Sequence, residues 1–139
     1  MTRLILDTCA VIDLITTPRL TDLEFWNVYD APDTLVFASF ETARELVVHF
    51  NNKRLLSKRW HTAKEMLTSI ERDYGIEFLP LRVDTAMTYA GLQLNEAMDH
   101  RDPSDHVIIA HAITEKLTLL SSDTRFPFYR EQGLDLIEY

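Results

Sequence analysis

Four acidic residues stand in this chain where a metal-dependent reaction on phosphodiesters would need them. Asp7 follows RLIL and Asp123 follows LTLLSS, while Glu45 lies in SFETARELVVHF and Asp105 in RDPSDHVIIAHA. Two of these acids end apolar, strand-like runs, and ligands of open α/β sheets bind beyond the carboxyl ends of the strands. Carboxylates gathered in one crevice repel one another unless a cation or a shared proton compensates. The pattern predicts a divalent-metal site.

Asp7 and Asp123 also have ordinary structural interpretations. Asp7 or Thr8 would serve equally well as the N-cap of the helical pattern that follows. Asp123, after two serines, is typical of a turn that leaves a strand. The sequence leaves both interpretations open for each residue, but their joint position after separate strands favours the site.

The helix that carries Asp105 has a recognisable start. Asp102 fits the N-cap, Pro103 the first helical position, and Asp105 the third, where negative charge complements the helix dipole. We interpret Asp102 as a cap. Asp105 would additionally face the crevice if this helix begins at the carboxyl edge of the sheet.

Glu41 and Glu45 compete for the second acidic position. They lie one turn apart on one face of a helix for which Ser39 is the expected N-cap. Glu41, in the first turn, is explained by the helix dipole, whereas Glu45 has no capping role. A glutamate that simply faces solvent remains an equal alternative for Glu45.

Strand-like and helical patterns alternate along the chain, which predicts an α/β fold. At 139 residues we expect one domain, 1–139, with a mostly parallel central sheet of about five strands flanked by helices. The expected strands are Leu4–Leu6, Thr34–Ala38, Ile76–Leu79, Leu117–Leu120 and Leu134–Ile137, and the expected helices are 9–17, 20–29, 39–50, 54–73, 83–99 and 104–116.

The charge is unevenly distributed. The formal net charge is −8, yet residues 44–64 contain six basic residues and one acidic residue, a local charge of +5. Such a stretch is typical of a solvated helix face, and a polyanionic substrate would give it a function.

Composition excludes several other classes. Cys9 is the only cysteine, so we expect no disulfide framework, a reducing cytoplasmic location, and a small buried side chain at this position. The five histidines show no zinc-ligand spacing and are interpreted as surface or partly buried polar residues. With three glycines there is no glycine-rich phosphate loop, and no apolar run is long enough to span a membrane.

These motifs together resemble the PIN-domain ribonucleases, particularly the VapC-like toxins of bacterial toxin–antitoxin pairs. The resemblance covers nearly the full length. LILDTCAVIDL is similar to the family's first strand with its acid, SFETAREL to its S-x-x-T-x-x-E-L helix, and RDPSDHVIIAHAITEKLTLLSSD to its D-P-x-D-R helix with the following strand. The family's acids then correspond to Asp7, Glu45 rather than Glu41, Asp105 and Asp123.

The resemblance implies a PIN-like domain with Mg²⁺- or Mn²⁺-dependent endoribonuclease activity. It makes the four acids metal ligands, with Thr8 or Ser121 supporting them, and the stretch that begins at Arg44 a candidate to hold RNA. The basic residues expected to do so are Arg44, Lys53 and Arg54. It further implies a homodimer and a small antitoxin that covers the site. Two departures, His106 for the usual arginine and Ser121 for the usual threonine, leave the acids unchanged.

Other functions remain open at this point. The same fold would suit a housekeeping RNA-processing nuclease, a structure-specific DNA nuclease, or a PIN-like binding module without catalysis, although the presence of all four acids disfavours the last. A receiver-like phosphoacceptor module would need an aspartate that ends a central strand, and the runs 34–38 and 76–79 end without one.

Overall fold

The structure, a computed structural model, describes residues 1–16, 23–52 and 55–139. The strands are β1 (Thr2–Leu6), β2 (Thr34–Ser39), β3 (Ile76–Leu79), β4 (Thr118–Ser121) and β5 (Asp135–Glu138). The α-helices are α1 (Thr8–Thr16), α2 (Leu23–Tyr29), α3 (Phe40–Asn51), α4 (Ala63–Tyr74), α5 (Val83–Ala90) and α6 (Pro103–Glu115), and the 3-10 helices are η1 (Leu55–Lys58), η2 (Glu96–Met98) and η3 (Pro127–Gln132). None of the described helices is long and apolar enough to cross a membrane.

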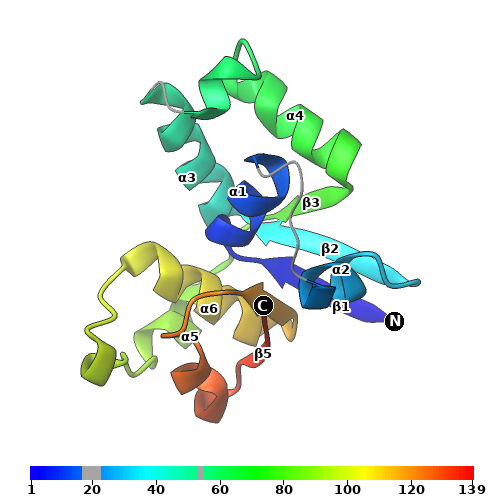
Figure 1. Cartoon of the computed structure of the whole chain (residues 1–139). Coiled ribbons are helices and arrows are strands. Elements are labelled where there is room, and N and C mark those ends of the chain that lie inside the picture. The colour runs from blue at the N-terminus through cyan, green and yellow to red at the C-terminus, as the bar shows by residue number, and fades with distance from the viewer. Residues whose placement is uncertain (17–22, 53–54) are drawn as a thin grey trace.

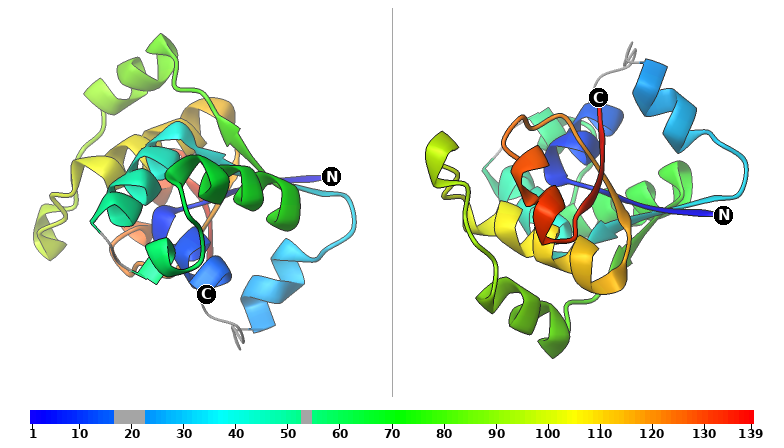
Figure 2. Two further views of the ribbon diagram at one scale, coloured as in Figure 1. Left: turned by 90° about the horizontal axis from the view of Figure 1, so that it is seen from above. Right: turned by 90° about the horizontal axis from the view of Figure 1, so that it is seen from below.

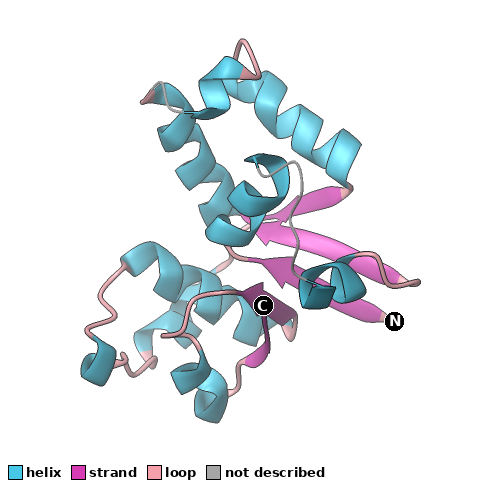
Figure 3. Ribbon diagram, in the orientation of Figure 1, coloured by secondary structure: helices cyan, strands magenta, loops and turns pink. Residues whose placement is uncertain are grey.

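The five strands form one parallel sheet in the order β3-β2-β1-β4-β5 (Figure 3). Leu4 at the centre pairs with Val36 on one side and Thr118 on the other. The predicted α/β fold is confirmed, and the sheet is parallel throughout. Because the chain builds outward from β1 first in one direction and then in the other, the order reverses between β1 and β4. A crevice at the carboxyl ends of these strands is where such sheets bind ligands.

Helices cover both faces of the sheet, so alternate residues of one strand enter two different cores (Figure 1). Leu4 and Leu6 pack with α1, α3 and α4 on one face, whereas Ile5 packs toward α6 on the other. Viewed from below, η3 lies beside α6 on this second face (Figure 2). Since Leu4, Ile5 and Leu6 are all fully buried, β1 is a rigid support for the residues that follow it.

Two predicted helices were wrong in extent. The helix expected over 54–73 starts only at Ala63, because Thr62 caps it by accepting a hydrogen bond from the Glu65 amide at 3.0 Å. The helix expected over 83–99 ends at Ala90, before Gly91. The residues that follow form an irregular segment, and it contributes to the site.

Candidate metal centre

Asp7 caps a helix and also lies beside other acids. It directly follows β1, and its Oδ1 accepts a hydrogen bond from the amide of Ala10 at 2.8 Å, which caps α1. Its Oδ2 accepts a hydrogen bond from the Ser121 hydroxyl at 2.5 Å. The residue is 3% exposed, and burial, opposed by these hydrogen bonds and reinforced by Asp105 and Asp123, raises the pKa of Asp7 to about 7. A cap alone would not need the negative neighbours.

Glu45, on α3, is turned toward the same edge. Its Oε1 accepts a hydrogen bond from the hydroxyl of Thr8 at 2.5 Å, and Thr8 also lies 3.0 Å from the hydroxyl of Thr42. Burial raises the pKa of Glu45, and Asp105 adds to the rise. The alternative of a purely solvent-facing glutamate does not describe this half-buried side chain.

Asp105 and Asp123 come from α6 and from the turn after β4. Asp105 is in the first turn of α6, which Asp102 caps through a 3.0 Å hydrogen bond from the amide of Ser104, as predicted. Burial, with Asp102 and Asp123, raises the pKa of Asp105 to about 7. Asp123 is instead held ionised, because hydrogen bonds from Arg125 lower its pKa despite partial burial.

Arg125 is a cation within this group that the sequence did not suggest. Its Nη2 is 2.7 Å from Asp123 Oδ2 and 3.6 Å from Asp105 Oδ2. The short spacing after Asp123 could have suggested a contact, but nothing in the sequence indicates that the side chain turns back toward the acids.

Ser121, at the end of β4, links Asp7 and Asp123 by hydrogen bonds. Its hydroxyl donates to Asp7 and accepts a 3.1 Å hydrogen bond from the Asp123 amide. Asp105 and Asp123 lie close enough to Asp7 to disfavour its ionisation. Asp123 does the same to Asp105, and Asp105 to Glu45. We name the four predicted acids, Asp7, Glu45, Asp105 and Asp123, the open cluster.

A second acidic group at this edge has its own counterion. Glu41 is 9% exposed, pairs with Arg44, and accepts a 2.7 Å hydrogen bond from the Ser104 hydroxyl. Burial alone would raise the pKa of Glu41, but Arg44 and Ser104 reverse the effect and lower it. We name Glu41, Arg44 and Ser104 the closed cluster. Arg44, predicted to contact RNA, is thus an ion-pair partner, and the other two predicted contacts, Lys53 and Arg54, lie outside the described residues.

His100 is the main residue of the site that sequence analysis missed. Its Nε2 lies 2.9 Å from Asp105 Oδ2, and one ligand atom each from His100, Asp105 and Asp123 lie within 4.8 Å of one another. Among the described residues this is the one group of three potential ligands at that spacing, and Asp7 is not a member of it. His100 lies in the irregular segment before α6, just after the helix expected over 83–99, so periodicity gave no signal for it.

Two other interpretations from the sequence were wrong. His100, His106 and His111 are almost fully buried rather than surface or partly buried, because they fill the space around α6 with aromatic and hydroxyl neighbours. Cys9 is exposed rather than buried, since it lies on the side of α1 away from the core.

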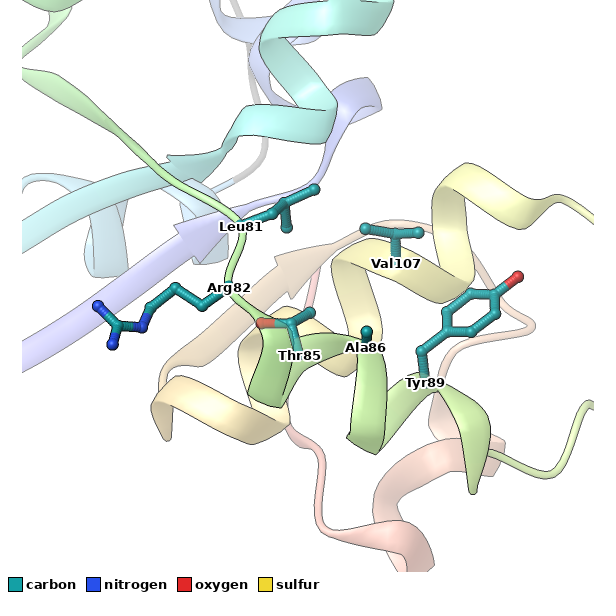
Figure 4. Close-up of a pocket in the computed structure, with 6 residues that line it drawn as sticks. All are labelled: Leu81, Arg82, Thr85, Ala86, Tyr89 and Val107. Carbon is teal, nitrogen blue, oxygen red and sulfur yellow. The ribbon is translucent and has the colours of Figure 1, made fainter.

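An apolar pocket lies elsewhere, between α5 and α6, with a volume of about 220 Å³ (Figure 4). Leu81, Tyr89 and Val107 frame it, and the Arg82 side chain extends away from them. The residues that line this pocket include no carboxylate, histidine or cysteine, so it offers no side-chain ligand of the kind that holds a metal ion. The open cluster is the better candidate for the functional site.

The donors of the open cluster suit a hard divalent cation. All four side chains offer carboxylate oxygens, which Mg²⁺ and Mn²⁺ prefer. The raised pKa values of Asp7 and Asp105 reflect buried negative charge that one guanidinium does not neutralise.

Comparison with known proteins agrees with this fold. The model of the PIN domain family matches residues 4–131. The structure is similar to a chain of VapBC2 from Rickettsia felis bound to a DNA fragment from its promoter (TM-score 0.74, 18% identity, covering 99% of this chain and 98% of that one). It is also similar to a chain of VapBC-5 of the toxin–antitoxin systems of Mycobacterium tuberculosis (TM-score 0.67, 22% identity, 100% of both chains). FitAcB from Neisseria gonorrhoeae gives a TM-score of 0.66 at 21% identity, covering 97% of this chain and 96% of that one.

No curated protein matches the chain. The identities to the solved structures are low, so those likenesses concern the fold. The family model, in contrast, spans most of the sequence and includes all four acids of the open cluster. The chain belongs to the PIN domain family.

Proposed function

We propose that this protein is a divalent-metal-dependent endoribonuclease, a VapC-like toxin that hydrolyses RNA and is inhibited by a small antitoxin. The observation that carries the proposal is the open cluster at the carboxyl ends of β1 and β4. There Asp7 is 3% exposed and has its pKa raised to about 7 beside Asp105 and Asp123. Membership of the PIN domain family and the likeness to chains of VapBC complexes support it.

Asp7, Glu45, Asp105 and Asp123 would hold Mg²⁺ or Mn²⁺. When bound, such an ion would lower the pKa of a water so that the water can lose a proton and attack phosphorus, and its positive charge would stabilise the leaving oxygen. Ser121 would fix the carboxylate of Asp7, and Thr8 that of Glu45, through their 2.5 Å hydrogen bonds. No side chain needs to form a covalent intermediate.

The choice of RNA as substrate rests on family resemblance and on local charge. Arg44, Lys53 and Arg54 belong to the basic stretch 44–64 of the sequence, and a phosphate backbone would be attracted to such a stretch in a salt-dependent way. Because Arg44 is already paired with Glu41, its contribution would be smaller than its charge suggests. Cleavage of DNA would indicate a DNA nuclease instead, and a housekeeping role in RNA processing would replace the role as a toxin.

The partners follow from the same resemblance. An acidic crevice favours an inhibitor that inserts an arginine or lysine, because charge-assisted hydrogen bonds are strong in a desolvated site. The homodimer would cover apolar side chains that α5 leaves exposed, such as Val83 (72%) and Met87 (70%). A cytoplasmic location belongs to this proposal too.

Incubation of a mixed RNA pool with the protein tests the proposal. We expect cleavage with Mg²⁺ or Mn²⁺ and none in EDTA, with DNA of the same sequences left intact. Undiminished cleavage in EDTA would refute the metal mechanism. Expression of the chain alone should arrest growth, and harmless expression of an active nuclease would indicate RNA processing instead.

A further inference from the structure

A chain of hydrogen bonds runs behind the open cluster, through residues that are not among its acids. The backbone amide of Asn95 lies 3.0 Å from the Tyr129 hydroxyl, which lies 3.0 Å from His100 Nδ1. His100 Nε2 lies 2.9 Å from Asp105 Oδ2. The imidazole side chain is completely buried, and Tyr129 is 0% exposed, so water does not compete for these atoms.

The groups at the two ends of this series of hydrogen bonds determine which atom donates and which accepts at each step. A backbone amide only donates, so the Tyr129 oxygen accepts from Asn95 and its hydroxyl hydrogen is free to point at His100 Nδ1. An ionised carboxylate only accepts, so His100 Nε2 carries the hydrogen directed at Asp105. A neutral imidazole with its hydrogen on Nε2 satisfies both contacts. The surroundings therefore select one tautomer and one ring orientation.

The same hydrogen-bond network also extends to Asp123. Asn95 Nδ2 donates to the backbone carbonyl of Arg125 at 3.1 Å, and the Arg125 amide donates to Asp123 Oδ1 at 2.9 Å. One irregular segment thus fixes the turn that carries Asp123 as well as the carboxylate of Asp105. This explains why residues after Gly91 leave the expected helix: a helical backbone would use the Asn95 amide internally.

We propose that His100 is a positioning residue for the metal site: oriented by Tyr129, its Nε2 hydrogen holds the Asp105 carboxylate in a single orientation toward the cation. The inference rests on the proposed function, since Asp105 must be a ligand for the orientation to matter. Groups that orient a ligand from behind contribute to metal affinity because the ligand does not have to be ordered on binding.

Two substitutions at position 100 separate this role from simple packing. In His100→Gln the amide reaches the place of Nε2 and still donates to Asp105, whereas in His100→Asn it reaches only the place of Nδ1 beside Tyr129. We expect His100→Asn to weaken Mn²⁺ binding about tenfold or more, and His100→Gln to restore most of the affinity. Tyr129→Phe, which frees the ring, should fall between them, with Tyr89→Phe on exposed α5 as the matched control.

Calorimetric titration with Mn²⁺ and melting in EDTA would be measured on each variant. Equal Mn²⁺ affinity in the wild type and His100→Asn would overturn the positioning role alone. It would also be overturned if His100→Asn and His100→Gln lost Mn²⁺ affinity equally and in parallel with their losses of melting temperature. No Mn²⁺ binding by the wild type would overturn the proposed function together with this inference. Nitrogen NMR of the wild type above the pKa of Asp105 adds a reading that needs neither metal nor a variant: hydrogen on Nε2 supports the proposal, and hydrogen on Nδ1 alone overturns it.

Discussion

The closed and open clusters differ in how their negative charge is compensated, although both lie at the carboxyl edge of the sheet. In the closed cluster, Glu41 has Arg44 and a hydroxyl, and its pKa falls. In the open cluster, Asp7 is buried and Asp105 partly buried beside other carboxylates, and the pKa of each rises to about 7. Carboxylic acids at one edge of the sheet thus have pKa values that are shifted in opposite directions.

This contrast suits the closed cluster to a role in stability and the open cluster to a role in function. A carboxylate with its own guanidinium and hydroxyl is satisfied by the protein and needs no ligand. Carboxylates whose ionisation the fold opposes store unfavourable energy, which a bound cation would relieve, and such groups concentrate at functional sites. The two clusters should therefore respond in opposite ways to removal of one charge.

The largest effect should come from Asp7→Asn. Loss of a central ligand should lower the rate of RNA cleavage by roughly 10²- to 10³-fold, the range for one group that stabilises developing charge. In EDTA the variant should be at least as stable as the wild type, because a neutral amide removes the buried charge and can still accept from Ala10. Rates and melting temperatures would be compared side by side. A variant that cleaves normally, or that merely unfolds, would contradict the contrast.

Next in size is the ranking of two glutamates. Glu45→Gln should lower the cleavage rate clearly while leaving stability almost unchanged. Glu41→Gln should do the reverse, with a loss of about 1–2 kcal/mol in the free energy of unfolding, because Arg44 and Ser104 lose an ionised partner. Denaturant unfolding and kinetics on both variants measure this. The opposite ranking would place the metal at Glu41.

This ranking also shows how far sequence could go. Asp7 and Asp123 were found because acids after buried strands must meet at the carboxyl edge of a parallel sheet, and the strands themselves follow from apolar patterns. Glu45 over Glu41 came from resemblance, since helix periodicity places both on one face. His100 and Arg125 were beyond prediction, because their positions depend on an irregular segment and a turn whose paths are set by long-range hydrogen bonds.

A divalent cation should stabilise the folded protein by mass action. At a Mn²⁺ concentration about 100 times Kd, the gain of about 2.7 kcal/mol should raise the melting temperature by roughly 5–10 °C. Asp123→Asn should show a smaller shift, and Glu41→Gln the same shift as the wild type from a lower starting point. Equal shifts in the wild type and Asp123→Asn would mean that Asp123 is only a turn residue.

A further effect is a dependence of stability on pH in EDTA. The pKa values of Asp7 and Asp105 rise from 3.8 to about 7 on folding, so their protonated forms are favoured in the native state. Their contribution to stability is complete below 3.8 and is lost as the pH rises toward about 7. Cation affinity should increase over the same range, since ligands must be ionised. Unfolding at a series of pH values, with Asp7→Asn showing a shallower fall, tests this; an equal fall in both would contradict it.

The central claim is that the open cluster, and not the closed one, holds the cation. Crystals soaked in Mn²⁺ and measured for its anomalous scattering would locate the ion directly. We expect a peak bounded by Asp7, Asp105 and Asp123, on the side of Asp105 away from His100. A peak at Glu41, or none at a Mn²⁺ concentration that supports RNA cleavage, would contradict it.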